Sequence, residues 1–207
     1  MGDRASGRAS SDEDVTETRE EQLAGRLRVA AELFAARGYG GTTTRELASA
    51  MGVTNGTFYH HFESKEALLR LVCLQALRTL DARVQAAVER ADEPLQKLEV
   101  LVQVHIAAIT ADRHAHVTML TDTRSLQGDQ RHEIIEARDR YERRVREVIG
   151  LGQRRGVLRD DIETATTARL LLNLLNWTIV WFSEEGAVPE EDLSGQMLTV
   201  FLDGARA

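Results

Sequence analysis

The sequence predicts an all-α protein of about nine helices. Apolar residues recur at spacings of three and four along most of the chain, which is the period of an amphipathic helix. Only two of the 207 residues, Pro94 and Pro189, are prolines, so helix breakers are rare. No segment alternates apolar and polar residues for long enough to indicate a strand.

The chain should begin with a disordered arm followed by one amphipathic helix. Residues 1–18 are mostly polar, with little to bury, so we expect them to be disordered. Leucine, alanine and phenylalanine then recur at helical spacing from Leu23 to Phe34. Arg37 and Gly38 end this helix with a basic last turn and a C′ glycine.

Two short helices should follow. Thr43 and Glu46 form a Thr-x-x-Glu capping box, which starts the first of them, and Gly52 ends it. The second starts near Thr54 and turns Phe58 inward. Two short helices joined at a glycine form a helix-turn-helix pattern.

The remaining predicted helices are longer, apart from one short segment in the middle. Their apolar stripes and end signals place one helix after the N-cap Ser64, one from Pro94 at N1, one over 115–126, one over 129–155, one from Asp160 or Asp161 through Phe182, and one from Pro189 to Gly204.

Composition excludes several classes of protein. A single cysteine, Cys73, rules out an internal disulfide framework and fits a reducing, cytoplasmic compartment. The net charge of -7 argues against bulk attraction to nucleic acid or an anionic membrane, while leaving room for a local DNA-binding face. The longest apolar stretch, Leu170 to Phe182, is shorter than the roughly 20 residues of a membrane span, and the N-terminus has no signal-peptide pattern.

The second short helix and its flanks have the side chains of a DNA-recognition element. Such an element presents small or hydrogen-bonding side chains to base edges and phosphates. Arg45 and Lys65 are placed to hold phosphates, and the helix N-termini at Thr43 and Ser64 add backbone donors. A solvated turn is the alternative, but it would not need this run of residues. The candidate base-reading residues are Thr54, Asn55, Thr57, Tyr59, His60 and His61.

This region resembles the DNA-binding domain of the TetR family of bacterial repressors. The resemblance is carried by Gly38-Tyr39, by Thr43-Thr44-Arg45-Glu46-Leu47-Ala48 and by the run from Met51 to Leu69. It implies an all-helical homodimer on a palindromic double-stranded operator, with a ligand cavity in the C-terminal domain. The residues it implies at the DNA are Thr43, Arg45, Thr57, Tyr59, His60 and Lys65, to which we add Thr44, Thr54, Asn55 and His61.

On this basis we expect three parts in the chain. They are a disordered arm at 1–18, a three-helix DNA-binding domain at 19–65, and a ligand-binding and dimerisation domain at 66–207. The segment from Leu170 to Phe182 is apolar all round and needs cover on more than one side. It is either a core helix of a monomer or, as the resemblance favours, part of a two-fold four-helix interface. The interface residues we predict are Leu171, Leu175, Phe182, Met197 and Phe201.

Polar residues on apolar faces of the C-terminal part suggest a ligand pocket. His105 is either a core histidine with one satisfied hydrogen bond or a cavity group. The segment around Asn176 and Trp177 is similar to TetR-type regulators that sense acyl-CoA thioesters, and Arg138 could meet phosphates. An aromatic drug-like effector, or a helical interaction module without an effector, would fit the same residues. The predicted ligand residues are His105, Met119, Asn173, Asn176, Trp177 and Trp181.

We expect no enzyme, no cofactor and no metal site. The sequence has no dinucleotide-binding glycine motif, no P-loop and no Gly-x-Ser-x-Gly nucleophile turn. His114 and His116 are two apart and so point in different directions on a helix, and His60 and His61 are adjacent. The prediction is therefore a ligand-responsive transcriptional regulator, most simply a repressor that an effector releases from DNA.

Overall fold

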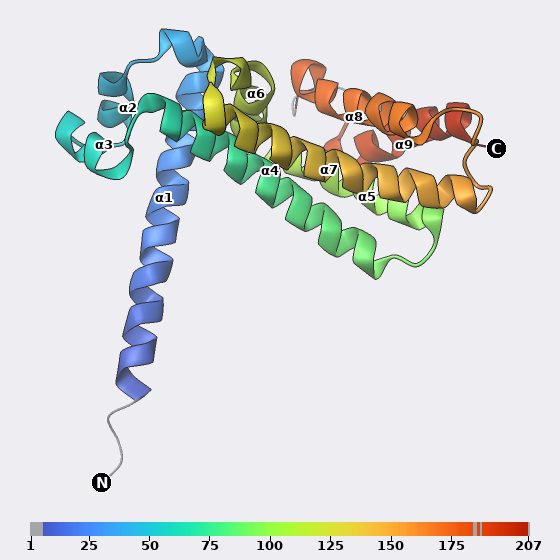
Figure 1. Ribbon diagram of the computed structural model, residues 1–207, viewed down its shortest axis with the longest axis horizontal. Coiled ribbons are helices and arrows are strands. Elements are labelled where there is room, and N and C mark those ends of the chain that lie inside the picture. Colours follow the sequence, from blue (N-terminus) through green and yellow to red (C-terminus); the bar gives the residue numbers. More distant parts are fainter. Residues whose placement is uncertain (1–5, 184–185, 187, 207) are drawn as a thin grey trace.

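The computed structural model describes the backbone of residues 6–183, 186 and 188–206, and the side chains of these residues except 6–18, 190 and 191 (Figure 1). Within that part the fold is all-α, as predicted, with nine α-helices and one 3₁₀ turn, η1. Their bounds are α1 Ser6–Gly41, α2 Thr44–Ala50, α3 Asn55–His61, α4 Lys65–Arg90, α5 Pro94–Ala111, α6 Arg113–Thr121, η1 Thr123–Ser125, α7 Gly128–Arg154, α8 Thr164–Trp181 and α9 Glu190–Ala205.

The capping signals read from the sequence are present at the short helices. Thr43 Oγ1 accepts a hydrogen bond from the Glu46 amide, and Glu46 Oε2 accepts one from the Thr43 amide at 2.8 Å. Ser64 Oγ accepts from the amide of Ala67 at 3.0 Å and so caps α4. Gly52 closes α2 with a φ of 69°, a conformation that favours glycine. The helix-turn-helix is therefore built from its own local sequence.

The start of α1 and the start of α8 differ from the sequence prediction. The backbone of α1 is helical from Ser6, inside the segment expected to be a disordered arm, and it breaks at Gly38, as predicted. α8 begins at Thr164 instead of after Asp160 or Asp161. The Asp161 carboxylate accepts two hydrogen bonds from the Arg159 guanidinium, at 2.5 and 2.6 Å, and is thus not available as a cap.

The first hydrophobic core lies at the end of the molecule where Figure 1 shows α2 and α3. Phe34 of α1 and Phe58 of α3 are its largest fully buried side chains. The first half of α4 also belongs to it, from Leu68 to Leu77, together with residues of α6 and α7 such as Met119 and Ile134. The C-terminal helices α6 and α7 therefore pack on α1 and α4, the two helices that flank the helix-turn-helix.

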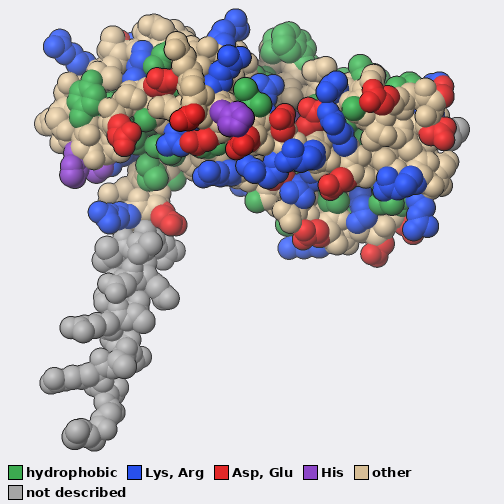
Figure 2. Space-filling view, in the orientation of Figure 1, with side chains coloured by type: hydrophobic (Ala, Val, Ile, Leu, Met, Phe, Trp, Pro, Cys, Tyr) green, Lys and Arg blue, Asp and Glu red, His purple; other side chains and the backbone are tan. Residues whose placement is uncertain are grey.

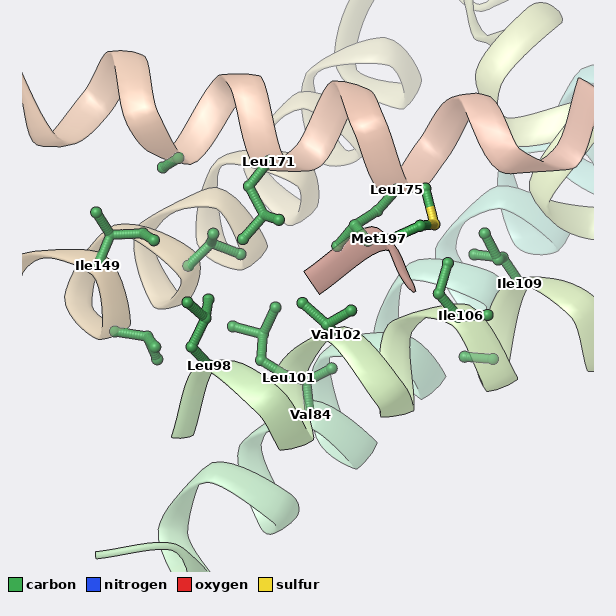
Figure 3. Close-up of a cluster of buried hydrophobic side chains, with 14 of the residues drawn as sticks. Val84, Leu98, Leu101, Val102, Ile106, Ile109, Ile149, Leu171, Leu175 and Met197 are labelled. Carbon is green, nitrogen blue, oxygen red and sulfur yellow. The ribbon is translucent and has the colours of Figure 1, made fainter. Parts of the chain in front are cut away.

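The second core is built by α4, α5, α7, α8 and α9, and Figure 3 shows its centre. Val84 of α4 and Leu101 of α5 face Ile149, Leu171 and Leu175 across it. α4 thus contributes to both cores, so the expected division at 65/66 does not separate two packing units and stays a prediction. Within the described residues, no helix is long and apolar enough to cross a bilayer.

Candidate DNA interface and ligand cavity

The helix-turn-helix presents one continuous polar face. Phe58 of α3 is fully buried in the core. It anchors the helix, so the opposite side of α3 is turned outward. Tyr59 is 51% exposed, and its hydroxyl donates to Thr44 Oγ1 of α2 at 3.4 Å. The predicted residues that share the outer surface, exposed or half-buried, are Thr43, Thr44, Arg45, Thr54, Asn55, Thr57, Tyr59, His60 and His61.

Two features of this face were not predicted. The hydroxyls of Thr54 and Thr57 hydrogen-bond to each other at 2.9 Å, which fixes both side chains at the start of α3. The pKa of His61 is lowered, first by partial desolvation and then by the positive charge of Arg26, with smaller effects of His60 and Arg19. α1 therefore adds positive charge beside α3, a juxtaposition that sequence spacing alone could not show.

Lys65 has a structural role that the sequence analysis did not assign. Its ammonium donates to the carbonyl of Tyr39 at 2.8 Å and to that of Thr42 at 2.7 Å. It also lies 4.1 Å from the centre of the Tyr39 ring, a cation–π distance. Lys65 thus ties the start of α4 to the end of α1 and so stabilises the fold, and the phosphate contact predicted for it stays a prediction.

Replacing Lys65 with methionine should therefore destabilise the protein. Two charge-assisted hydrogen bonds to carbonyls are lost, each worth about 1.5–3 kcal/mol. The melting temperature should fall by about 10 °C, because 1 kcal/mol corresponds to roughly 2–4 °C in a chain of this size. Arg45→Met is the matched control, because Arg45 is exposed and should leave the melting temperature unchanged. Equal melting temperatures for both variants would show that the Lys65 contacts carry no stability.

The region between α6 and α7 links the two ends of the molecule. Asp122 Oδ2 accepts a hydrogen bond from the Tyr39 amide at 3.1 Å, and Thr118 Oγ1 donates to the Ala31 carbonyl at 3.3 Å. On the other side, Arg70 of α4 pairs with Glu133 of α7 at 2.6 Å. A shift of α6 would be transmitted to α1 through the contacts of Thr118 and Asp122. α6 also lines the cavity described next, so a ligand there could cause such a shift.

A cavity of about 230 Å³ opens between α4, α6, α7 and α8. Met119, Asn173 and Asn176, three of the predicted ligand residues, line it. Its walls combine leucine side chains with charged and polar groups, which suits a ligand with an apolar and a polar part. The remaining lining residues are Leu77, Leu80, Leu120, Arg138, Tyr141, Glu142, Arg169 and Leu172.

The cavity's polar groups differ in how they are held. Glu142 accepts from Arg169 at 3.1 Å and also pairs with Arg146, whereas Arg138 has no ion pair among the described side chains. The Tyr141 hydroxyl lies 2.6 Å from Nδ1 of His105. Tyr141, Glu142 and Arg169 were missed by the sequence analysis, because their apolar or charged positions on α7 and α8 resemble ordinary helix faces.

His105 is fully buried behind Tyr141 and does not line the cavity. Burial lowers its pKa to about 3, so the imidazole is neutral. It is therefore a core histidine with one satisfied hydrogen bond, which is the first of the two roles considered for it. Through that bond it orients Tyr141, which lines the cavity. The thiol of Cys73 is likewise buried, and burial raises its pKa to about 12, as expected for an inert cysteine.

The predicted dimer residues lie inside their own chain. Leu171, Leu175 and Met197 are buried in the second core, Phe182 is 9% exposed, and Phe201 packs against that core. Leu171 and Leu175 of α8 therefore point away from any partner, because an apolar helix gives no sequence signal for which face turns inward. Phe201 of α9 is half-exposed and stays a predicted interface residue. Trp177 and Trp181, predicted as ligand residues, are instead exposed by 66% and 53% and do not line the cavity.

An uncovered apolar stripe runs along α8, and α9 adds one exposed apolar side chain. Leu170, half-buried Leu174, Trp177 and Trp181 repeat at helical spacing and so form one stripe. Val180 of α8 and Val200 of α9 are also exposed, by 58% and 69%. We call these six residues the α8–α9 face. Large contiguous apolar patches mark interaction surfaces in soluble proteins.

Comparison with known proteins decides the family. A family model for the C-terminal domain of tetracyclin-repressor-like proteins matches residues 91–205, and one for bacterial regulatory proteins of the tetR family matches residues 27–72. The chain belongs to the TetR family. It is a transcriptional regulator and not an enzyme, and TetR regulators bind operator DNA and act as dimers.

Individual TetR relatives agree over most of the chain. The transcriptional repressor KstR2 of Mycolicibacterium smegmatis is 30% identical over 180 residues, which is 86% of this chain and 87% of that protein. The structure of PfmR from Thermus thermophilus is 32% identical with a TM-score of 0.80, over 86% of this chain and 97% of PfmR. AibR, solved with isovaleryl coenzyme A and operator DNA, shares the fold at 24% identity and a TM-score of 0.80, covering 86% of this chain and 97% of AibR.

Proposed function

We propose that this regulator is a cytoplasmic repressor released from a palindromic operator by a small effector of the acyl-CoA class. The effector has an apolar acyl group and an anionic part, and it binds in the cavity between α4, α6, α7 and α8. The observation that carries the proposal is the lining itself, where leucines meet Arg138 and Arg169. Arginines recognise phosphate groups through fixed pairs of donors.

The contacts around α6 support release by the effector. Met119 and Leu120 of α6 line the cavity, while Thr118 and Asp122 of the same segment hydrogen-bond to α1. A ligand that displaces α6 would therefore move the helix-turn-helix relative to α4. Two recognition helices must match half-sites at a fixed spacing on DNA, so such a movement lowers operator affinity.

The cavity size favours a short acyl group. Its volume of about 230 Å³ is below the roughly 300–1,000 Å³ of drug-sized ligand sites. A ketosteroid-related effector is the second candidate, because one structure with the same fold and 25% identity is that of the ketosteroid transcriptional regulator KstR2. A steroid nucleus would need a larger cavity.

Acyl-CoAs of increasing chain length should separate these candidates. We expect butyryl- or isovaleryl-CoA to raise the melting temperature and release operator DNA, with free coenzyme A doing neither. A ligand at 100 times its Kd adds about 2.7 kcal/mol of stability. The measurements are a thermal-shift series and an operator mobility shift. Long-chain acyl-CoAs or steroids acting in place of the short ones would overturn the size argument.

Arg138→Gln should raise the dissociation constant of butyryl-CoA about tenfold. This corresponds to the loss of roughly 1.4 kcal/mol from one charged contact. Arg140→Gln is the matched control, because Arg140 is exposed on the same helix and does not line the cavity. Isothermal titration with butyryl-CoA measures both. Equal losses in the two variants would place the anionic part of the effector elsewhere.

A further inference from the structure

A second cavity lies where α1, α4 and the junction between α5 and α6 meet. Its volume is about 470 Å³, which is larger than the effector cavity and within the usual range for small-molecule sites. Only Leu80 lines both cavities, so the two are separated by α4. Three of its lining side chains are small, which leaves space for a ligand: Ala76, Ala108 and Ala111.

The walls of this second cavity carry more positive than negative charge. Arg28 of α1, Arg83 of α4 and Arg113 of α6 line it, against the carboxylates of Glu32 and Asp112. Among the described side chains Arg28 and Arg83 have no ion pair. Arg113 donates to the Ile179 carbonyl through Nε at 3.2 Å and Nη2 at 2.7 Å, which leaves its Nη1 available. The N-terminus of α6 opens here too, with no side-chain cap on its amides.

The buried imidazole of His116 forms part of the same wall. Only 3% of His116 is exposed, and its Nδ1 lies 3.0 Å from the Asp112 carbonyl, so Nδ1 carries the proton. Its Nε2 then has a free lone pair and no hydrogen-bond partner. This nitrogen is itself buried, so His116 shapes the wall without offering a hydrogen bond to a ligand in the cavity.

We propose that this cavity is a second ligand site, which binds a small hydroxylated anion. Its phosphate or carboxylate is held by Arg28, Arg83 and Arg113, and its hydroxyls are held by Glu32. The site is distinct from that of the proposed acyl-CoA effector. It touches the helix that leads into the helix-turn-helix, α1, and the helix that lines the effector cavity, α6. A bound anion therefore ties these two helices together.

Glucose 6-phosphate and citrate are the probes, because they carry hydroxyls with a phosphate and with carboxylates respectively. Titration calorimetry of the full chain at fixed ionic strength should show saturable binding of at least one probe. Binding of glucose 6-phosphate alone indicates a phosphate ligand, and binding of citrate alone indicates a carboxylate ligand. Neither probe binding at concentrations up to about 10 mM would overturn the proposal.

Variants locate the bound probe. Arg83→Gln and Arg28→Gln should each weaken binding by about tenfold, the loss of one charged contact. Arg78→Gln is the control, because Arg78 is exposed on the same helix as Arg83 and lies outside both cavities. Butyryl-CoA binding should be unchanged in all three. If Arg138→Gln weakens the probe and Arg83→Gln does not, the anion occupies the effector cavity and the second site is wrong.

Discussion

Replacing Trp177 with aspartate should turn the dimer into monomers and remove operator binding. Trp177 is 66% exposed at the centre of the α8–α9 face, and in the dimer we expect that face to be covered by its two-fold copy. The charge would then be buried twice, once per subunit. At about 3 kcal/mol for each unpaired buried charge, the dimer dissociation constant rises by roughly 10⁴.

Sedimentation or size-exclusion experiments on the folded variant would measure this change. Ile135→Asp is the matched control, because Ile135 is an apolar residue, 42% exposed on α7, that does not belong to the α8–α9 face. It should remain dimeric. Leu175→Asp is not a useful test, since Leu175 is fully buried in its own chain and the variant should fail to fold. A stable dimer of Trp177→Asp would exclude this face as the interface.

The sequence predicted the helix-turn-helix in detail because its signals are local. The capping box of Thr43 and Glu46, the glycine turn at Gly52 and the inward Phe58 each depend on residues a few positions apart. Such signals act within one helix turn and survive any tertiary arrangement. For the second core the sequence predicted the helices but not how they pack. Which side chains of each helix face this core is set by contacts between distant segments.

The errors of prediction lie where two faces of one helix compete. Leucines stand on every side of α8, and only its packing against α5, α7 and α9 decides that Leu171 and Leu175 turn inward and Leu170 outward. Lys65 is a similar case, since its partners Tyr39 and Thr42 lie more than twenty positions earlier in the chain. Figure 2 shows charged side chains of both signs spread over the same surface, so charge pattern alone marks no site there.

Tyr59→Ala should abolish operator binding while leaving the fold intact. Tyr59 is half exposed beside Thr57 and His60, and its ring packs edge-on against the buried Phe58 with centroids 5.4 Å apart. The hydroxyl and the ring edge are thus held rigidly on the outer side of α3, where a DNA duplex would meet them. One lost contact costs about 2 kcal/mol, and the dimer loses it in both half-sites, so operator affinity should fall by roughly a thousandfold.

Two comparisons make this expectation specific. Tyr59→Phe keeps the ring and removes the hydroxyl, so it separates a hydrogen bond to DNA from packing against the duplex. Phe58→Ala removes a fully buried ring at a cost of about 3–5 kcal/mol and should lower the melting temperature, which Tyr59→Ala should not. Fluorescence anisotropy on operator DNA and circular dichroism measure the two effects separately. If Tyr59→Ala binds the operator as well as the unchanged protein does, the side of α3 that carries Asn55 and Tyr59 does not meet the DNA.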